Sequence, residues 1–432
     1  MSRLRHVMGG RYKVLFGNIV ARLAALVSLA FATLVVARTG GPAAVGVYVL
    51  LRVLPSLIGV VFAAGLPGSV AYFRAGPHRD DPRLPFTLVS IALVGGVTGA
   101  AAWVAASSLI ERALFPDLSL GLVMLSGVLV LTRVIVATAK SCSQGSDDLR
   151  GANRVIFTEE FNFLPVYGLI WAMGGRGLTA VVIGLVLADV ATLSLGWGRL
   201  IRRRFFSDAA PPSRDLARVI VAYGLRAQLG GVISLMNLRL DFILLSLMTS
   251  PAVLGVYAVA SKFAELVRIP GMSLTYVLYP RFAREGRAEA ARNARRLLPK
   301  AGLLTAAAVV PLWLAAGFVI PSIYGSEFSP AVVPARIILF GLVLDGVGSV
   351  VTGFLYGVGR PGLNSWAMAV GLAATVVLDV ALIPPFGAVG AAVASAVAYL
   401  MVSIALVGFF WWVAKSVSML PVRAKLPSAD AG

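Results

Sequence analysis

The sequence has few charges, few metal-binding side chains and a shortage of acidic residues. Charged residues are 13% of its 432 residues, where a soluble domain has about 25%, and hydrophobic residues are 59%. The single Cys142 excludes an internal disulfide, and His6 and His78 lie in polar segments without metal-ligand spacing. We therefore expect an integral membrane protein that holds neither a metal nor another cofactor.

The shortage of acidic residues makes the chain strongly basic. Lys and Arg number 38 against 19 Asp and Glu, and the first acidic residue is Asp80. No connection between apolar runs is long enough for a soluble domain that could bind a duplex, so we expect no nucleic-acid partner. Attraction to anionic membrane lipids, about 1 kcal/mol per basic residue near the surface, explains the charge better.

The apolar runs are too long for barrel strands and indicate an all-α membrane protein. They predict about twelve spans, at 14–36, 43–66, 84–109, 118–139, 155–173, 177–197, 218–247, 252–278, 301–322, 331–356, 364–383 and 387–413. Of the basic residues, 27 lie in the tails and every second connection, 3 in the alternate connections and 8 inside the spans. By the positive-inside rule, both termini of this multi-pass protein are cytoplasmic, in the inner membrane of a bacterial or archaeal cell.

The two halves of the chain repeat one another. Phe16-Gly17 and Gly46-Val47-Tyr48 return about 209 residues later as Tyr223-Gly224 and Gly255-Val256-Tyr257, and Asn153 has a counterpart in Asn364. Six spans in each half make the repeat parallel, which is typical of transporters that rock two lobes about a central site. We predict an N-terminal six-helix lobe (1–198), a basic cytoplasmic linker (199–217), a C-terminal six-helix lobe (218–413) and a cytoplasmic tail (414–432).

Short motifs in the second half carry a resemblance to a known family. They are Arg239-Leu240-Asp241, Leu254-Gly255-Val256-Tyr257, Tyr324-Gly325-Ser326-Glu327-Phe328, Gly357-Val358-Gly359-Arg360-Pro361 and Pro384-Pro385-Phe386-Gly387-Ala388-Val389-Gly390-Ala391-Ala392. With these motifs in order, the chain resembles the Wzx-type polysaccharide-synthesis flippases of the multidrug/oligosaccharidyl-lipid/polysaccharide (MOP) superfamily. The resemblance implies two six-helix lobes around a central cavity lined by spans 1, 2, 7 and 8.

Polar residues at helical spacing fit such a cavity, because residues three or four apart share one helix face. The four polar faces are Asn18 and Arg22; Tyr48, Arg52 and Ser56; Arg226, Gly230, Ser234, Asn237 and Asp241; and Tyr257, Ser261, Glu265 and Arg268. An ionised side chain in hydrocarbon costs at least ~2.5 kcal/mol, so arginines on these faces indicate a functional site.

The resemblance implies a substrate with a polyprenyl tail, a pyrophosphate and an oligosaccharide, flipped to the outer leaflet by alternating access. Arginine suits pyrophosphate because its planar fork donates two parallel hydrogen bonds. We assign the anion to Arg22, Arg52, Arg226, Arg239 and Arg268, and the sugar hydroxyls to Asn18, Tyr48, Ser234, Asn237 and Tyr257. The candidates for ion coupling are Asp241, Asp345 and Asp379. The expected partners are this lipid-linked oligosaccharide, membrane lipids, and a polysaccharide polymerase or other assembly proteins.

Simpler roles remain open for some charged residues. Arg133 and Arg336 lie near the ends of their spans, where both could extend to the membrane interface. Glu265 can pair with Lys262 or Arg268 on the same helix.

Two other functions remain open as well. A MATE-like multidrug or cation antiporter needs acidic residues in the cavity, and spans 1 and 2 have none. A membrane glycosyltransferase or polysaccharide polymerase needs a catalytic acid or a large extramembrane loop, and neither is evident. We therefore expect a transporter and not an enzyme.

Overall fold

Helices run through the part of the chain that the computed structural model describes, residues 2–75 and 78–418, and no strand occurs in it. The first half contains α1 (Ser2–Phe62), α2 (Leu66–Ala75), α3 (Leu84–Ala105), α4 (Ser107–Leu114), α5 (Leu120–Gly145), α6 (Leu149–Phe161), α7 (Phe163–Ala172) and α8 (Gly177–Arg202). The second half contains α9 (Arg214–Met248), α10 (Pro251–Glu265), α11 (Arg268–Arg284), α12 (Arg287–Tyr324), η1 (Ser326–Ala331), α13 (Val332–Gly341), η2 (Leu342–Leu344), α14 (Asp345–Gly357) and α15 (Pro361–Ser418). The all-α fold expected from the sequence is confirmed.

The two longest helices are each broken at a glycine. A straight helix of the length of α1, 61 residues, would measure about 90 Å, three times the thickness of a bilayer core. Gly41 (φ 69°) and Gly387 (φ 52°) take left-handed backbone conformations that side-chain-bearing residues rarely adopt, and the chain turns back at each. Each of these helices therefore holds two of the predicted spans.

The predicted spans coincide with helices along the whole described chain. Seven helical segments of the described residues are long and apolar enough to cross a membrane, including Val20–Phe62 and Pro361–Lys415, which contain the two breaks. The remaining predicted spans fall on α9 and on two interrupted helix pairs, α6–α7 and α10–α11. The chain is a multi-span membrane protein, and the number of twelve crossings stays a prediction.

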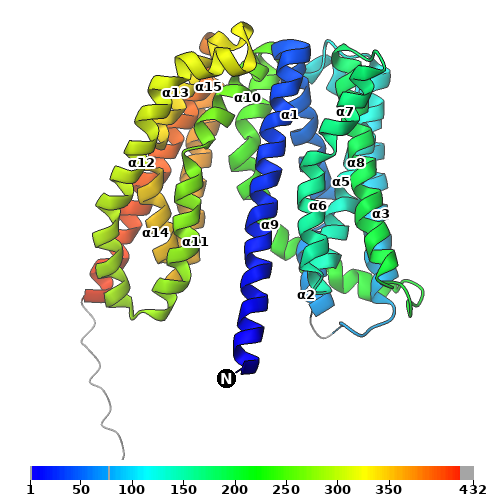
Figure 1. Cartoon of the computed structure of the whole chain (residues 1–432), viewed down its shortest axis with the longest axis horizontal. Coiled ribbons are helices and arrows are strands. Elements are labelled where there is room, and N and C mark those ends of the chain that lie inside the picture. Colours follow the sequence, from blue (N-terminus) through cyan, green and yellow to red (C-terminus); the bar gives the residue numbers. More distant parts are fainter. Residues whose placement is uncertain (1, 76–77, 419–432) are drawn as a thin grey trace, which may run out of the picture.

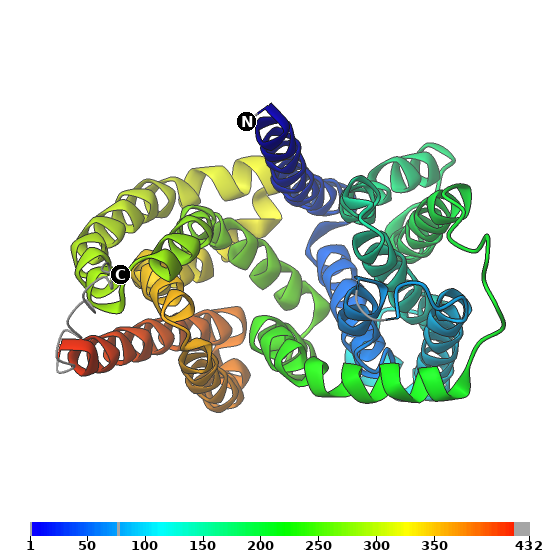
Figure 2. The same cartoon turned by 90° about the horizontal axis from the view of Figure 1, so that it is seen from below.

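The helices form two groups that meet at one end and separate at the other (Figure 1). Helices α2 to α8 lie in one group and α11 to α15 in the other, as the view from below also shows (Figure 2). Helix α10 packs on α1, and α9 contacts both α2 and α15, so it passes from one group to the other. Side-chain packing follows this shape. One buried cluster at the meeting end includes Val45 and Leu254, whereas the separated ends have cores of their own, around Leu88 and Phe354.

The meeting end is closed by a reciprocal contact between the two halves. Gly46 lies against the backbone carbonyl of Pro251, and Gly255 lies against that of Pro42, so a Cβ at either glycine would overlap the carbonyl oxygen. The two glycines are 209 residues apart, and so are the two prolines, which is the offset of the repeat in the sequence. Each half therefore contributes the same proline and glycine to the contact, as in a two-fold interface. Arg38 adds hydrogen bonds to the carbonyl oxygens of Ser322 and Ile323.

Candidate functional site

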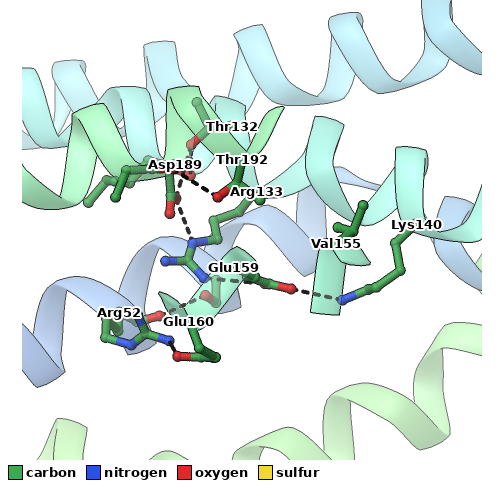
Figure 3. Close-up of polar contacts among 12 residues, drawn as sticks. Arg52, Thr132, Arg133, Lys140, Val155, Glu159, Glu160, Asp189 and Thr192 are labelled. Carbon is green, nitrogen blue, oxygen red and sulfur yellow. Dashed lines mark hydrogen bonds and ion pairs between the residues drawn. The ribbon is translucent and has the colours of Figure 1, made fainter. Parts of the chain in front are cut away.

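Six charged side chains from four helices, one buried and five partly buried, lie together inside the first half (Figure 3). The members of this first-half network are Arg52 on α1, Arg133 and Lys140 on α5, Glu159 and Glu160 on α6, and Asp189 on α8. Arg52 pairs with Glu160 through Nη2. Arg133 lies 2.8 Å from Asp189 and 3.4 Å from Glu159, and Lys140 lies 3.1 Å from Glu159.

The network balances three positive charges with three negative ones. Such balance matters because a buried charge without a partner costs several kcal/mol. Thr132 completes the surroundings of Asp189 by donating a hydrogen bond of 3.2 Å. The expectation that Arg133 extends to the membrane interface is wrong: its side chain is 10% exposed because two carboxylates hold it inside the bundle.

A second polar chain connects α1 to the same helix α6. The Arg22 Nε atom donates to Asn18 Oδ1 at 3.0 Å, and Asn18 Nδ2 donates to Asn153 Oδ1 at 2.6 Å. Asn153 and Glu160 are seven residues apart, two turns of α6, and so lie on one face of the helix. This face therefore contacts both predicted anion-binding arginines of α1, Arg22 through Asn18 and Arg52 directly.

The second half contains buried acids of a different kind. Asp241 at the end of α9 accepts a hydrogen bond of 2.6 Å from Tyr257, whose hydroxyl also lies 2.9 Å from Ser395. Asp379 on α15 is fully buried, within electrostatic range of Asp241, and neither carboxyl oxygen has a hydrogen-bond partner among the described residues. We call Asp241, Tyr257, Asp379 and Ser395 the second-half acid cluster.

Several other charged residues of the second half have partners on neighbouring helices or on their own helix. Asp345, a predicted ion-coupling residue, lies 3.3 Å from Arg268, a predicted anion ligand, and Arg268 also stacks on Tyr399. Glu265 pairs with Lys262 at 2.8 Å, as expected, while Arg268 begins a new helix after the break between α10 and α11. Arg239 lies over the ring of Phe242.

Two predicted sugar ligands are placed where a sugar does not reach. Tyr48 and Tyr257 are 0% and 1% exposed. Tyr257 donates a hydrogen bond to Asp241. The Tyr48 ring packs against Phe163, and its buried hydroxyl has no hydrogen-bond partner among the described residues. The prediction that these tyrosines contact sugar hydroxyls is therefore not supported in this conformation. Helical spacing placed both on polar faces, but neighbouring helices cover those faces.

Three predicted ligands cannot be placed. The side chains of Arg226, Ser234 and Asn237 lie outside the residues whose side chains the structure describes, and residues 419–432 of the predicted tail lie outside the described chain.

Among the described residues, no group of three or more His, Cys, Asp or Glu side chains could hold a metal ion. Arg336 stacks on Trp313 and donates to its carbonyl oxygen at 3.1 Å.

Glu159, Glu160, Asp189 and Asn153 were missing from the predicted site. Their helices, α6 and α8, are not among the spans that the resemblance assigns to the cavity lining. One signal was present in the sequence: Glu159-Glu160 is an acidic pair within a predicted span, and such a pair requires basic partners.

One strong ion pair lies outside the predicted spans. Asp148 accepts two hydrogen bonds from Arg199, at 2.6 and 2.8 Å, and a third from the backbone of Gly151 at the start of α6. The hydrogen bonds from the Arg199 side chain lower the pKa of Asp148 below its usual value. This pair joins the connection before α6 to the end of α8.

Comparisons with known proteins agree with this fold. The family model described as "Polysaccharide biosynthesis protein" matches residues 35–333. The chain is 22% identical over 262 residues to the "Probable low-salt glycan biosynthesis flippase Agl15" of Haloferax volcanii, covering 58% of this chain and 54% of that protein. It is 24% identical over 212 residues to the uncharacterized membrane protein MJ1068 of Methanocaldococcus jannaschii, covering 47% and 42%. The matches thus span about half the length of these curated relatives.

Solved transporters share the fold at low sequence identity. The lipid II flippase MurJ in an inward closed conformation has a TM-score of 0.73 at 13% identity, covering 94% of this chain and 90% of that one. An inward-facing multidrug resistance MATE family transporter of the MOP superfamily has a TM-score of 0.70 at 17% identity, covering 94% and 99%. The chain therefore belongs to the polysaccharide biosynthesis protein family and has the fold of MOP superfamily transporters.

Proposed function

We propose that the protein flips a polyprenyl-pyrophosphate-linked oligosaccharide from the cytoplasmic to the outer leaflet of the cell membrane. Its family takes part in polysaccharide biosynthesis, and the Agl15 relative is described as a probable flippase of glycan biosynthesis. The substrate carries two negative charges at the point where tail and sugar join. A binding site for it needs basic side chains inside the membrane, where an uncompensated arginine is otherwise costly.

The placement of Arg22 and Arg52 supports this function most directly. Both lie on α1, on opposite sides of the Gly41 break, and both are connected to one face of α6. Arg22 is exposed and held through its neighbour Asn18, so its guanidinium can approach a headgroup. In the proposed site these two arginines hold the pyrophosphate, the second half contributes Arg239 and the predicted ligand Arg226, and Asn18 contacts the first sugar.

The proposed transport cycle uses the two helix groups as lobes. In this conformation the Gly46–Pro251 and Gly255–Pro42 contacts close the end that we assign to the outer side, because the basic connections lie at the other end. Lobes 1–198 and 218–413, joined by the linker 199–217, would rock so that this contact opens after the substrate has bound. Both termini would remain cytoplasmic throughout.

Export of this substrate would draw energy from the membrane potential. Moving two negative charges outward across about 100 mV is favourable by roughly 4–5 kcal/mol. The second-half acid cluster would add ion coupling. Asp379 and Asp241 form a buried site for a proton or a monovalent cation, whereas Asp345 is less suited because Arg268 already neutralises it.

Flipping in proteoliposomes tests the proposal. A fluorescent polyprenyl-pyrophosphate oligosaccharide should reach the opposite leaflet with the wild type, and Arg22→Ala and Arg52→Ala should each reduce the rate at least about 100-fold, the effect of losing two charge-assisted hydrogen bonds. Arg336→Ala is the matched control, since Arg336 rests on Trp313 near the far end of its predicted span. Wild-type rates in both variants, or export of cationic drugs in place of the lipid, would overturn the proposal.

A further inference from the structure

We propose that Glu160 is a resident counter-ion of Arg52, which the incoming pyrophosphate must displace and which takes Arg52 back when the substrate leaves. This inference rests on the proposed function and assigns a positioning and selecting role to a residue of α6. In the empty transporter the Glu160 carboxylate would accept a hydrogen bond from Arg52, and in the loaded transporter the pyrophosphate would accept it instead.

The geometry of the Arg52–Glu160 pair is that of an exchangeable contact. A guanidinium has five N–H donors, and arginine–carboxylate pairs are frequently bidentate. Asp148 forms such a pair with Arg199, through Nε and Nη2. Glu160 instead accepts from Nη2 of Arg52 alone, and this is the one hydrogen bond of the Arg52 side chain to the described residues. In the proposed exchange, the other donors of the guanidinium receive the incoming anion while this single hydrogen bond is given up.

The neighbouring acid Glu159 shows the opposite arrangement. Lys140 and Arg133 both hold its carboxylate, so removing that carboxylate would take a partner from two cations. Glu160 has Arg52 as its one ionic partner among the described residues. The two adjacent glutamates on α6 therefore differ in their partners, since Glu159 is shared by two cations and Glu160 pairs with one.

Exposure separates both glutamates from the third acid of the network. The Arg52 side chain is 12% exposed and that of Glu160 is 21% exposed, so the carboxylate is the outer member of the pair. Glu159 is exposed to the same degree, 22%, but two cations hold it, and Asp189 is 5% exposed. Glu160 is therefore the one carboxylate of the network that combines partial exposure with a single cation.

An exchange of anions at Arg52 avoids two separate costs. Without Glu160, the Arg52 guanidinium of the empty transporter would be an unpaired charge inside the membrane. If Glu160 could not leave, Arg52 would bind the pyrophosphate only weakly. Competition also selects the cargo. A group with one negative charge gains little over the carboxylate that it replaces, whereas a pyrophosphate brings two charges and several acceptor oxygens. The return of Glu160 then helps to release the headgroup on the outer side.

Binding of a polyprenyl pyrophosphate without sugars to the purified full-length protein tests this role. Glu160→Gln should bind it about 10-fold more tightly, because one charge-assisted hydrogen bond no longer has to be broken. The same variant should flip more slowly, since release is no longer assisted. It should also bind polyprenyl monophosphate nearly as well as the pyrophosphate. Glu285→Gln, which removes a carboxylate paired with Arg281 outside the predicted spans, is the matched control and should leave the affinity unchanged, within the roughly 2-fold scatter of such comparisons.

Two further variants separate this role from a structural one. In the Arg52→Ala background, Glu160→Gln should give no gain in affinity, because the competition takes place at Arg52. Glu160→Asp, which keeps the charge, should bind and flip like the wild type. If the amide variant does not fold, Glu160→Ala replaces it as the test, because it also removes the charge. Equal or weaker binding by Glu160→Gln, with binding lost in Arg52→Ala, would overturn the inference and leave the proposed function intact. Failure of the wild type to bind the pyrophosphate would overturn both.

Discussion

The two halves of the molecule carry buried charge in different ways. In the first half, Arg52, Arg133 and Lys140 are matched by the three carboxylates of α6 and α8. In the second half, Asp241 is bonded to a tyrosine, and Asp379 has no hydrogen-bond partner among the described residues. The repeat makes this contrast direct, because Tyr48 and Tyr257 occupy equivalent positions: Tyr48 lies beside Arg52, and Tyr257 lies on an acid.

The contrast indicates that the two halves, which repeat short sequence motifs, have different functions. A balanced network can receive an anion by exchanging one carboxylate, as proposed for Glu160. A carboxyl group without a basic partner can receive a cation, either a proton or a metal ion. We infer that the first half holds the anionic headgroup and the second half senses the coupling ion.

The largest effect should come from unbalancing the first-half network. Arg133→Met leaves Asp189 without its cation, so the free energy of unfolding should fall by about 3–5 kcal/mol. Thermal unfolding in detergent, followed by reaction of a thiol-specific dye with the buried Cys142, measures the loss. Adding Asp189→Asn should recover most of it, because cation and anion are then removed together. An Arg133→Met protein as stable as the wild type would remove the basis of the comparison.

Asp379→Asn should affect stability in the opposite sense. Replacing a buried carboxyl group that has no hydrogen-bond partner should leave the protein as stable or more stable, by up to about 1 kcal/mol. Flipping should slow by about 10-fold and lose its dependence on a proton or sodium gradient, because the coupling ion has lost its ligand.

The control for this variant is Asp345→Asn. It leaves Arg268 unpaired and should lower stability without altering the dependence on the ion gradient. A gradient response that survives in Asp379→Asn but disappears in Asp345→Asn would move the ion site to the second residue.

A smaller effect is expected where α6 supports Arg22. Asn153→Ala removes the acceptor of Asn18, so Arg22 loses part of its support and flipping should slow by about 5-fold, the equivalent of one hydrogen bond of ~1 kcal/mol. Its repeat counterpart offers a control, since the buried Asn364 amide has no hydrogen-bond partner among the described residues. If Asn364→Ala slowed flipping as much as Asn153→Ala, the two halves would not differ in this respect.

The smallest effect concerns a pair outside both clusters. Because Arg199 lowers the pKa of Asp148 in the folded protein, this pair stabilises the fold above the unfolded pKa of about 3.9 and loses its effect as the pH falls through the lowered value. Between pH 5 and pH 3, the free energy of unfolding of the wild type, measured by thermal unfolding, should therefore fall by about 1 kcal/mol more than that of Asp148→Asn. Parallel pH profiles would show that the pair contributes nothing.

The sequence predicted the fold well because membrane helices obey local rules. Long apolar runs located the helices, and the gaps between predicted spans at 37–42 and 384–386 fall at or next to the breaks at Gly41 and Gly387. The breaks within α6–α7 and α10–α11 were not predicted, since the predicted spans run through Asn162 and Leu266 without a clear signal.

The candidate site was predicted less completely, because helical spacing shows which residues share a helix face but not which other helix packs against that face. Tyr48 and Tyr257 share faces with Arg52 and Arg268, yet other helices bury them. The partners of the arginines come from α6 and α8, more than 100 residues away in the case of Arg52 and Glu160, and no local pattern links such positions.

The affinity of Arg52→Ala and Asp379→Asn for a polyprenyl pyrophosphate tests the central claim most directly. Equilibrium binding to the two purified variants should show a loss of about 30-fold or more for Arg52→Ala, the effect of a charge-assisted hydrogen bond, and wild-type affinity for Asp379→Asn. Loss of binding in Asp379→Asn, with binding retained in Arg52→Ala, would contradict the assignment of the headgroup to the first half.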